Sequence, residues 1–178
     1  MAGPIVSVRR AQHFAPGFTI YGRIAAKPLG KITRPLDSLH LSLAIYDGYS
    51  TTIIDGQPTM TEAGWGNFLR IRTSVSTTMP SDVVVSAALQ PPAGMSAEVF
   101  ALSLLTKASQ FASYTQRYSF PKRLGETMGD GKYNSSSYLA GLLRSVMGHV
   151  PHLDFRGYQI PGWESPVPLS AFKGEAIR

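Results

Sequence analysis

The sequence contains no cysteine. This absence excludes disulfide bonds, thiolate zinc sites and a cysteine nucleophile. A long apolar run is also lacking: the first ten residues do not combine a basic region with an apolar segment, so we expect neither a signal peptide nor a transmembrane segment. We therefore expect a cytoplasmic protein, or one exported by a secretion system that does not need a signal peptide.

Several familiar active-site motifs are missing too. The chain has no Gly-x-Gly-x-x-Gly after a strand, no phosphate-loop lysine motif and no Gly-x-Ser-x-Gly elbow. His149 and His152, with Asp154, could in principle bind a metal, but Gly148 and Pro151 break any helix that would fix their geometry. We therefore predict no metal and no cofactor.

The composition that remains indicates one folded domain. The chain has 178 residues, of which 43% are hydrophobic and 16% charged, as is typical of a protein that can bury a core. Its formal charge is +6, but the basic residues are dispersed, so no basic binding face is evident from the sequence. We expect a single domain over 1–178, with a strand-rich part at 1–90, a helical part at 95–148 and an irregular wrapping tail at 149–178.

The first half of the chain has the pattern of strands. Short β-rich stretches bounded by Pro, Gly or Asp predict strands over Ile5–Arg9, Phe18–Ile24, Leu39–Tyr46, Thr51–Ile54, Phe68–Val75 and Val83–Ala87. In the third stretch, Leu39, Leu41 and Leu43 alternate with smaller or polar residues. The leucines are expected to share one face, and His40 opens the more polar face.

The second half has the pattern of helices. Apolar residues at helical spacing predict a helix over Ala97–Tyr114, capped by Ser96, and a second that follows Asn134–Ser137 and ends at Gly148. Beyond it, Pro161-Gly162-Trp163 belongs to an irregular tail. The order of strands and then helices predicts an α+β fold, with an antiparallel β-sheet packed against two or three helices.

The most informative segment is the hydroxyl-rich helix start Asn134–Ser137. Its side chains could cap the helix, or one hydroxyl could serve as a nucleophile if a histidine takes its proton. His40 is the candidate base, because the other three histidines lie in loop-like segments. Asp55 on the next strand would hold the imidazole, with Gln57 as the alternative, although Asp55 could equally cap a turn.

These residues resemble a known superfamily. His40 to Tyr46 is similar to the His-x-x-x-x-Ile-Tyr strand of the circularly permuted papain-like hydrolases, which include the lecithin:retinol acyltransferase-like enzymes. Asn134 to Tyr138 resembles their Asn-Cys-x-x-Phe motif, with Ser135 in place of the cysteine. The resemblance implies a permuted papain-like fold with Ser135, His40 and Asp55 catalytic, and with Asn134 and Ser136 at the oxyanion.

A second resemblance is to bacterial toxin-like modules that carry the motifs Tyr-Asn-Ser-Asn-Ser-Phe, Ile-Ser-Gly-Gly-Pro and Pro-Gly-Trp. The chain has the similar segments Tyr133 to Tyr138, Ile54 to Pro58 and Pro161 to Trp163. The resemblance implies that Gln57, Tyr133 and Trp163 contact substrate. It also implies a possible role as an effector or toxin that meets an inhibitory, immunity-type protein.

The function expected from these motifs is hydrolysis or transfer at an amide or ester, with a peptide, cell-wall or lipid acyl substrate. Serine is a weaker nucleophile than cysteine, so Ser135 could be native, an engineered replacement, or part of an inactive papain-like binding module. We expect no nucleic-acid partner. The alternative binding module would use an aromatic and basic cluster made of Tyr114, Tyr118, Phe120, Tyr133, Arg117, Lys122 and Arg123.

Overall fold

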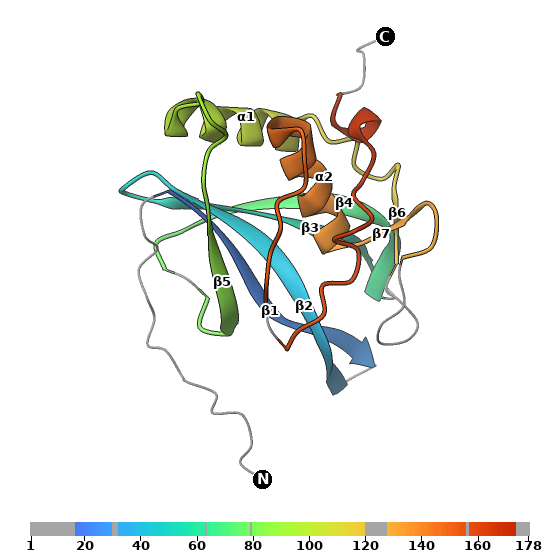
Figure 1. Ribbon diagram of the computed structural model, residues 1–178. Coiled ribbons are helices and arrows are strands. Elements are labelled where there is room, and N and C mark those ends of the chain that lie inside the picture. Colours follow the sequence, from blue (N-terminus) through green and yellow to red (C-terminus); the bar gives the residue numbers. More distant parts are fainter. Residues whose placement is uncertain are drawn as a thin grey trace.

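The computed structural model describes residues 17–29, 32–62, 64–78, 80–119, 128–155 and 157–173. In this part of the chain, two α-helices, α1 (Ala97–Ser109) and α2 (Ser135–Met147), lie on one face of a curled, mixed seven-stranded sheet (Figure 1). The α+β class is therefore confirmed. The strand expected over Ile5–Arg9 lies outside the described residues, as do Phe120, Lys122 and Arg123.

The sheet contains strands from both halves of the chain. They are β1 (Gly17–Leu29), β2 (Ile32–Tyr46), β3 (Thr51–Thr61), β4 (Gly64–Ser76), β5 (Val83–Leu89), β6 (Arg117–Tyr118) and β7 (Lys132–Tyr133). Their order is β5-β1-β2-β3-β4-β6-β7, and every adjacent pair is antiparallel except β6 and β7. The prediction of an antiparallel sheet is wrong at this edge, because the long connection between β6 and β7 lets the chain return in the same direction.

Alternation along β2 decides which face the helices cover. Leu39, Leu41 and Leu43 are at most 3% exposed, and they belong to one apolar cluster with residues of α1 (Ala97–Ser109) and α2 (Ser135–Met147). The predicted leucine face is confirmed. Successive side chains of a strand point to opposite faces, so His40 leaves β2 on the other side.

The first helix begins where the sequence predicts and ends earlier. Ser96 caps it through a side-chain hydrogen bond. The helix stops at Ser109 instead of Tyr114, because the chain turns there to bond another element: the Tyr114 amide donates to the carbonyl of Leu69 in β4 at 3.1 Å. A tertiary hydrogen bond thus replaces the last turn that the spacing predicts.

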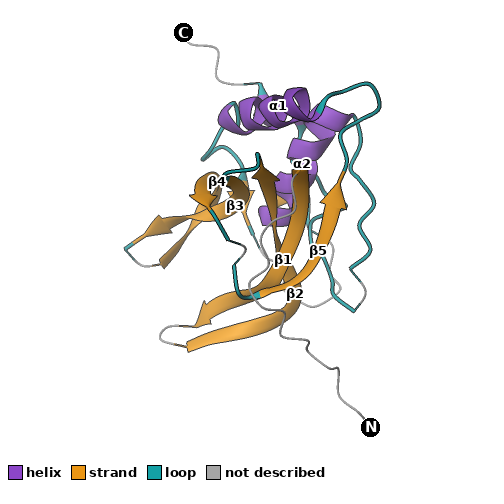
Figure 2. Cartoon of the chain, turned by 90° about the vertical axis from the view of Figure 1, so that its left-hand side faces the viewer, coloured by secondary structure: helices purple, strands orange, loops and turns teal. Residues whose placement is uncertain are grey.

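Two neighbouring strands separate in the middle of the sheet. Pairing between β2 and β3 ends at Leu43 and Ile54, whereas β2 stays paired with β1 and β3 with β4. Figure 2 shows the β3–β4 hairpin leaving the β1–β2 hairpin in a different direction. The tail bonds to β2 beyond this point, where the Leu39 amide donates to the Gln159 carbonyl at 3.0 Å. We call the place where β2 and β3 separate the fork.

Candidate functional site

The helix start predicted from the sequence is confirmed, and Asn134 is its cap. The Asn134 side-chain oxygen accepts the amide of Ser137 at 3.0 Å and the Ser137 hydroxyl at 3.3 Å. At the other end, Gly148 adopts the left-handed conformation with φ of +80° and closes α2, as expected for a C-terminal glycine. The hydroxyl-rich segment therefore positions a helix as well as offering hydroxyls.

The three serines at this helix start have different environments. All are buried, with Ser135 4% exposed. The Ser137 hydroxyl is used by the cap, and the Ser136 hydroxyl is buried without a hydrogen bond to any described residue. The amides of Ser135 and Ser136 likewise have no acceptor in the described part of the chain. These two N–H groups and the helix dipole would favour a negative charge beside Ser135.

The C-terminal tail holds the capping residue in place. The Asn134 amide group donates to the Pro161 carbonyl at 2.8 Å, and the Val167 amide donates to the Ser137 carbonyl at 3.0 Å. Gly162 lies between these bonds with φ of +89°. A Cβ there would meet the Ser137 hydroxyl and come within 2.6 Å of the Asn134 oxygen, so no side chain fits.

A histidine–carboxylate pair lies at the fork. His40 Nε2 is 3.8 Å from Asp55 Oδ2, which is ion-pair range but too long for a hydrogen bond. The side chains are 18% and 5% exposed. Of the two candidate orienting residues, the structure therefore places Asp55 beside the imidazole. Nε2 is thus the ring nitrogen that faces Asp55.

The helix start packs on the strand that carries Asp55. Helix α2 packs against β2 and β3, and its first turn lies directly over β3, where a Cβ on Gly56 would be 2.8 Å from Tyr138 Cβ. Burial raises the pKa of the Tyr138 hydroxyl, and the negative charge of Asp55 raises it further. The negative charge of Asp55 thus acts on a hydroxyl group of α2. No hydrogen bond joins Ser135 to His40 in the described part of the chain.

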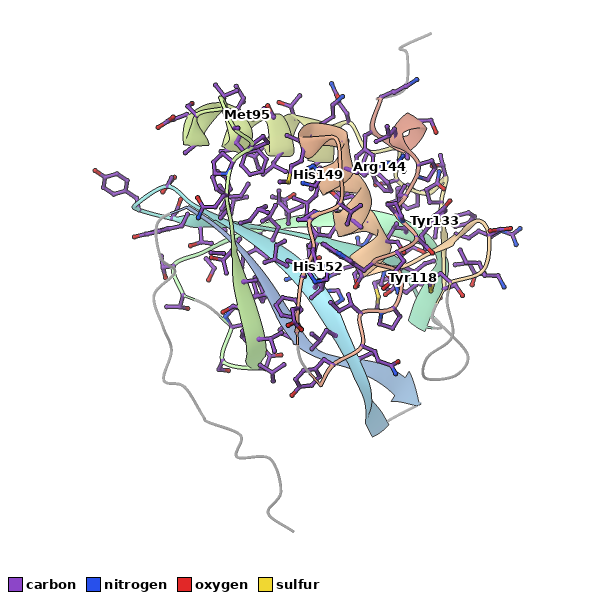
Figure 3. The ribbon with its side chains drawn as sticks, viewed as in Figure 1. Met95, Tyr118, Tyr133, Arg144, His149 and His152 are labelled. Carbon is purple, nitrogen blue, oxygen red and sulfur yellow. The ribbon has the colours of Figure 1, made fainter. Side chains whose placement is uncertain are left out.

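The three residues expected to contact substrate are spread over different elements. Gln57 is half-buried on β3, opposite Arg70 of β4. Tyr133 lies beside Tyr118 at the β6–β7 edge (Figure 3) and packs on the apolar cluster. Trp163 is buried, and its indole N–H donates to the Pro151 carbonyl at 3.1 Å. The surroundings of Trp163 thus give it a packing role in the tail.

The two histidines after α2, His149 and His152, do not form a cluster. His149 and His152 occupy separate places along the segment that follows α2 (Figure 3), and His149 Nδ1 lies 3.2 Å from the Met147 carbonyl oxygen. Among the described residues, no group of three or more His, Asp or Glu side chains could hold a metal ion. No described helix has the length and apolar character needed to cross a membrane.

The structure adds polar neighbours that the sequence did not single out. Arg23 of β1 is the cross-strand partner of His40, and Tyr21 is that of Ser42. Ser42 and Tyr21 are at most 1% exposed, and burial is the main reason that the pKa of Tyr21 is raised. Ser42 lies two residues from His40, so the alternation of β2 places both on the same face. The β1–β2 register that brings in Arg23 could not be read from composition or spacing.

Comparison with protein-family models, with curated proteins and with solved structures finds no match to this chain. The function assigned to the site therefore depends on its own residues and their geometry.

Proposed function

We propose that this protein hydrolyses or transfers an acyl group, with Ser135 as nucleophile, His40 as base and Asp55 as the group that orients His40. The observation that carries the proposal is the His40–Asp55 pair at 3.8 Å, at a fork beside which α2 begins. A permuted papain-like arrangement, with a strand histidine and a nucleophile at a helix start, accounts for these placements together.

The chemistry follows from the roles of three groups. The Ser135 oxygen attacks the carbonyl carbon of an amide or ester while His40 Nδ1 takes the hydroxyl proton. The negative charge that forms on the carbonyl oxygen is stabilised by the unpaired amides at the start of α2. The imidazolium then gives its proton to the leaving group, and an acyl-serine remains.

The second half of the reaction decides the outcome. Water that loses a proton to His40 attacks the acyl-serine and releases the acid, which is hydrolysis. If an alcohol or amine attacks instead, the acyl group is transferred. Peptide, cell-wall and lipid acyl groups are all compatible with this chemistry. An effector that an immunity-type protein inhibits would be one biological setting for it.

The proposal requires the imidazole of His40 to reach Ser135 through the fork. A chain without cysteine permits a direct test, because Ser135→Cys introduces a single thiol. An imidazole within reach would lower the pKa of that thiol below its ordinary value of about 8.5. We expect rapid alkylation of Ser135→Cys by iodoacetamide near neutral pH. The rate should fall at least about tenfold when His40→Ala is added, since an unassisted thiol is mostly protonated there.

The matched control is Ser145→Cys, in a later turn of the same helix. Ser145 donates its hydroxyl hydrogen to the Leu142 carbonyl and lies away from the helix start, so its thiol should react slowly with or without His40. An alkylation rate of Ser135→Cys that does not change with His40→Ala would overturn the proposal. In that case the helix dipole alone would act on the thiol.

The wild-type chain offers a chemical counterpart. A fluorophosphonate probe should label Ser135, and labelling should be lost in Ser135→Ala and in His40→Ala but kept in Ser145→Ala.

A catalytically inactive module is the second candidate function. The observation that favours it is the 4% exposure of Ser135, combined with the direction in which His40 leaves β2. This candidate predicts no probe labelling and no effect of His40 on the introduced thiol.

A further inference from the structure

Four cationic side chains lie together on three adjacent strands at one end of the sheet. Arg70 and Arg72 are two residues apart on β4, so their side chains leave the same face. Arg117 of β6 is the cross-strand partner of Phe68 on β4, and Lys132 of β7 is the partner of Arg117. We call Arg70, Arg72, Arg117 and Lys132 the basic strip.

The basic strip faces away from the helices. Leu69 of β4 is fully buried, and with Ile71 it packs on the cluster that α1 and α2 cover. The residues that alternate with them point to the opposite face, which carries no helix in Figure 1. Phe68 is 41% exposed there, and Arg72, Arg117 and Lys132 are exposed as well.

These cations are not neutralised within the described part of the chain. The ion pairs of Arg23 with Asp82 and of His40 with Asp55 contain no residue of the basic strip. Asp55 is the cross-strand partner of Arg72, but it is buried and its close contact is with His40. Arg70 has a buried Nε without a hydrogen-bond partner. Four positive charges next to an exposed aromatic ring are thus available to an external anion.

We propose that the basic strip binds an acidic segment of a polypeptide in an extended conformation. Arg70 and Arg72 are about 6.8 Å apart along the strand, the same spacing as alternate side chains of an extended peptide. A peptide with carboxylates at every second position would therefore place one opposite each guanidinium, and Arg forms paired hydrogen bonds with carboxylates. An apolar residue on the same segment would cover Phe68.

A peptide fits this surface better than a nucleic acid. Single-stranded nucleic acids are held by several aromatic rings along a basic groove, whereas among the side chains that the structure describes Phe68 is the exposed aromatic one on these strands. The proposal concerns binding alone and does not depend on Ser135 or His40. It can therefore be tested in a variant that lacks both residues.

The experiment measures binding of a fluorescent peptide with alternating Glu and Ser by anisotropy, at low and at high salt. Arg70→Ala/Arg72→Ala should weaken binding about tenfold, since two exposed ion pairs are lost. The matched control is Arg144→Ala/Lys173→Ala, which removes two exposed cations elsewhere, with Arg144 on α2 (Figure 3). This control should change affinity less than about twofold, because only long-range attraction is reduced.

Three results would overturn the proposal. The first is no binding of the alternating peptide by the wild-type chain. The second is equal weakening in the basic-strip variant and the matched control, which would mean attraction by net charge alone. The third is tighter binding of a single-stranded oligonucleotide of the same charge, which would assign the face to nucleic acid. A peptide with the same composition but with its Glu residues in one block should bind more weakly than the alternating peptide.

Discussion

The Asn134 cap of α2 and the fork both contain buried polar residues, but their hydrogen bonding differs. At the helix start, both polar atoms of the Asn134 side chain are bonded, one to Ser137 and the other to Pro161. At the fork, His40 Nε2 and one oxygen of Asp55 are buried without any hydrogen-bond partner among the described residues. Buried polar groups are normally paired, because an unpaired one loses its bonds to water without replacement.

This difference in hydrogen bonding distinguishes a structural role from a chemical one. The Asn134 cap owes its position to bonds within the chain, so both polar atoms of its side chain are already satisfied. The fork is held in place by the sheet around it and leaves polar atoms for water, substrate or a reacting proton. Substitutions of the Asn134 cap should therefore reduce stability, whereas substitutions of His40 and Asp55 should act on the chemistry that we propose.

Gly162→Ala should have the largest effect on stability. The added methyl group would meet the Ser137 hydroxyl and the Asn134 oxygen, and alanine would be strained at φ of +89°. We expect a loss of about 3 kcal/mol in the free energy of unfolding, measured by urea denaturation. Gly157→Ala is the matched control: Gly157 has φ of +83°, and a Cβ there would meet nothing within 4 Å. That control should cost only about 1 kcal/mol. Equal losses of unfolding free energy in the two variants would mean that the contact between Gly162 and the helix start does not contribute to stability.

Substitutions of Asn134 should have the next largest effect. Asn134→Ala removes the cap and the bond to Pro161, and should lower the free energy of unfolding by about 2 kcal/mol. Asn134→Ser keeps a capping oxygen but is too short to reach Pro161, so it should lose about 1 kcal/mol. Thermal unfolding of the two variants measures the cap and the tail contact separately. A serine variant as unstable as the alanine variant would assign the whole effect to the tail.

Local patterns predicted most of the fold. The leucine alternation of β2, the Ser96 and Asn134 caps and the glycine that ends α2 depend on neighbouring residues, and the structure has each of them. The early end of α1 at Ser109 could not be predicted, because it depends on a hydrogen bond to Leu69 of β4. Distant contacts of this kind leave no periodic signal in the sequence.

The candidate site could likewise be predicted only in part. The proximity of His40 and Asp55 follows from a hairpin between two alternating strands, and the structure has it. The fork was not predictable, since nothing in the spacing of β2 and β3 shows that their pairing ends at Leu43 and Ile54. The close contact between Gly162 and Asn134 could not be predicted either. It depends on the backbone geometry that brings the tail against the start of α2.

Tyr138→Phe should have the smallest effect at neutral pH and a clear one in alkali. The Tyr138 hydroxyl is buried without a partner among the described residues, so its removal should raise the free energy of unfolding by up to about 1 kcal/mol. Burial, and then the charge of Asp55, raise the pKa of this hydroxyl above its ordinary value of 10.0. The resulting stability is fully present below pH 10 and is lost above it, as the unfolded chain releases the proton.

Each buried tyrosine should therefore lower the free energy of unfolding by about 1.4 kcal/mol per pH unit above pH 10. Burial raises the pKa of Tyr118 as well, so the wild-type chain contains at least two such groups. Urea denaturation across the alkaline range should show a steeper loss for the wild type than for Tyr138→Phe. Asp55→Asn should let Tyr138 ionise at a lower pH, followed by tyrosinate absorbance, because one of the two causes of its raised pKa is gone. An unchanged tyrosinate titration in Asp55→Asn would show that the charge at the fork does not act on α2, and that the two regions are independent.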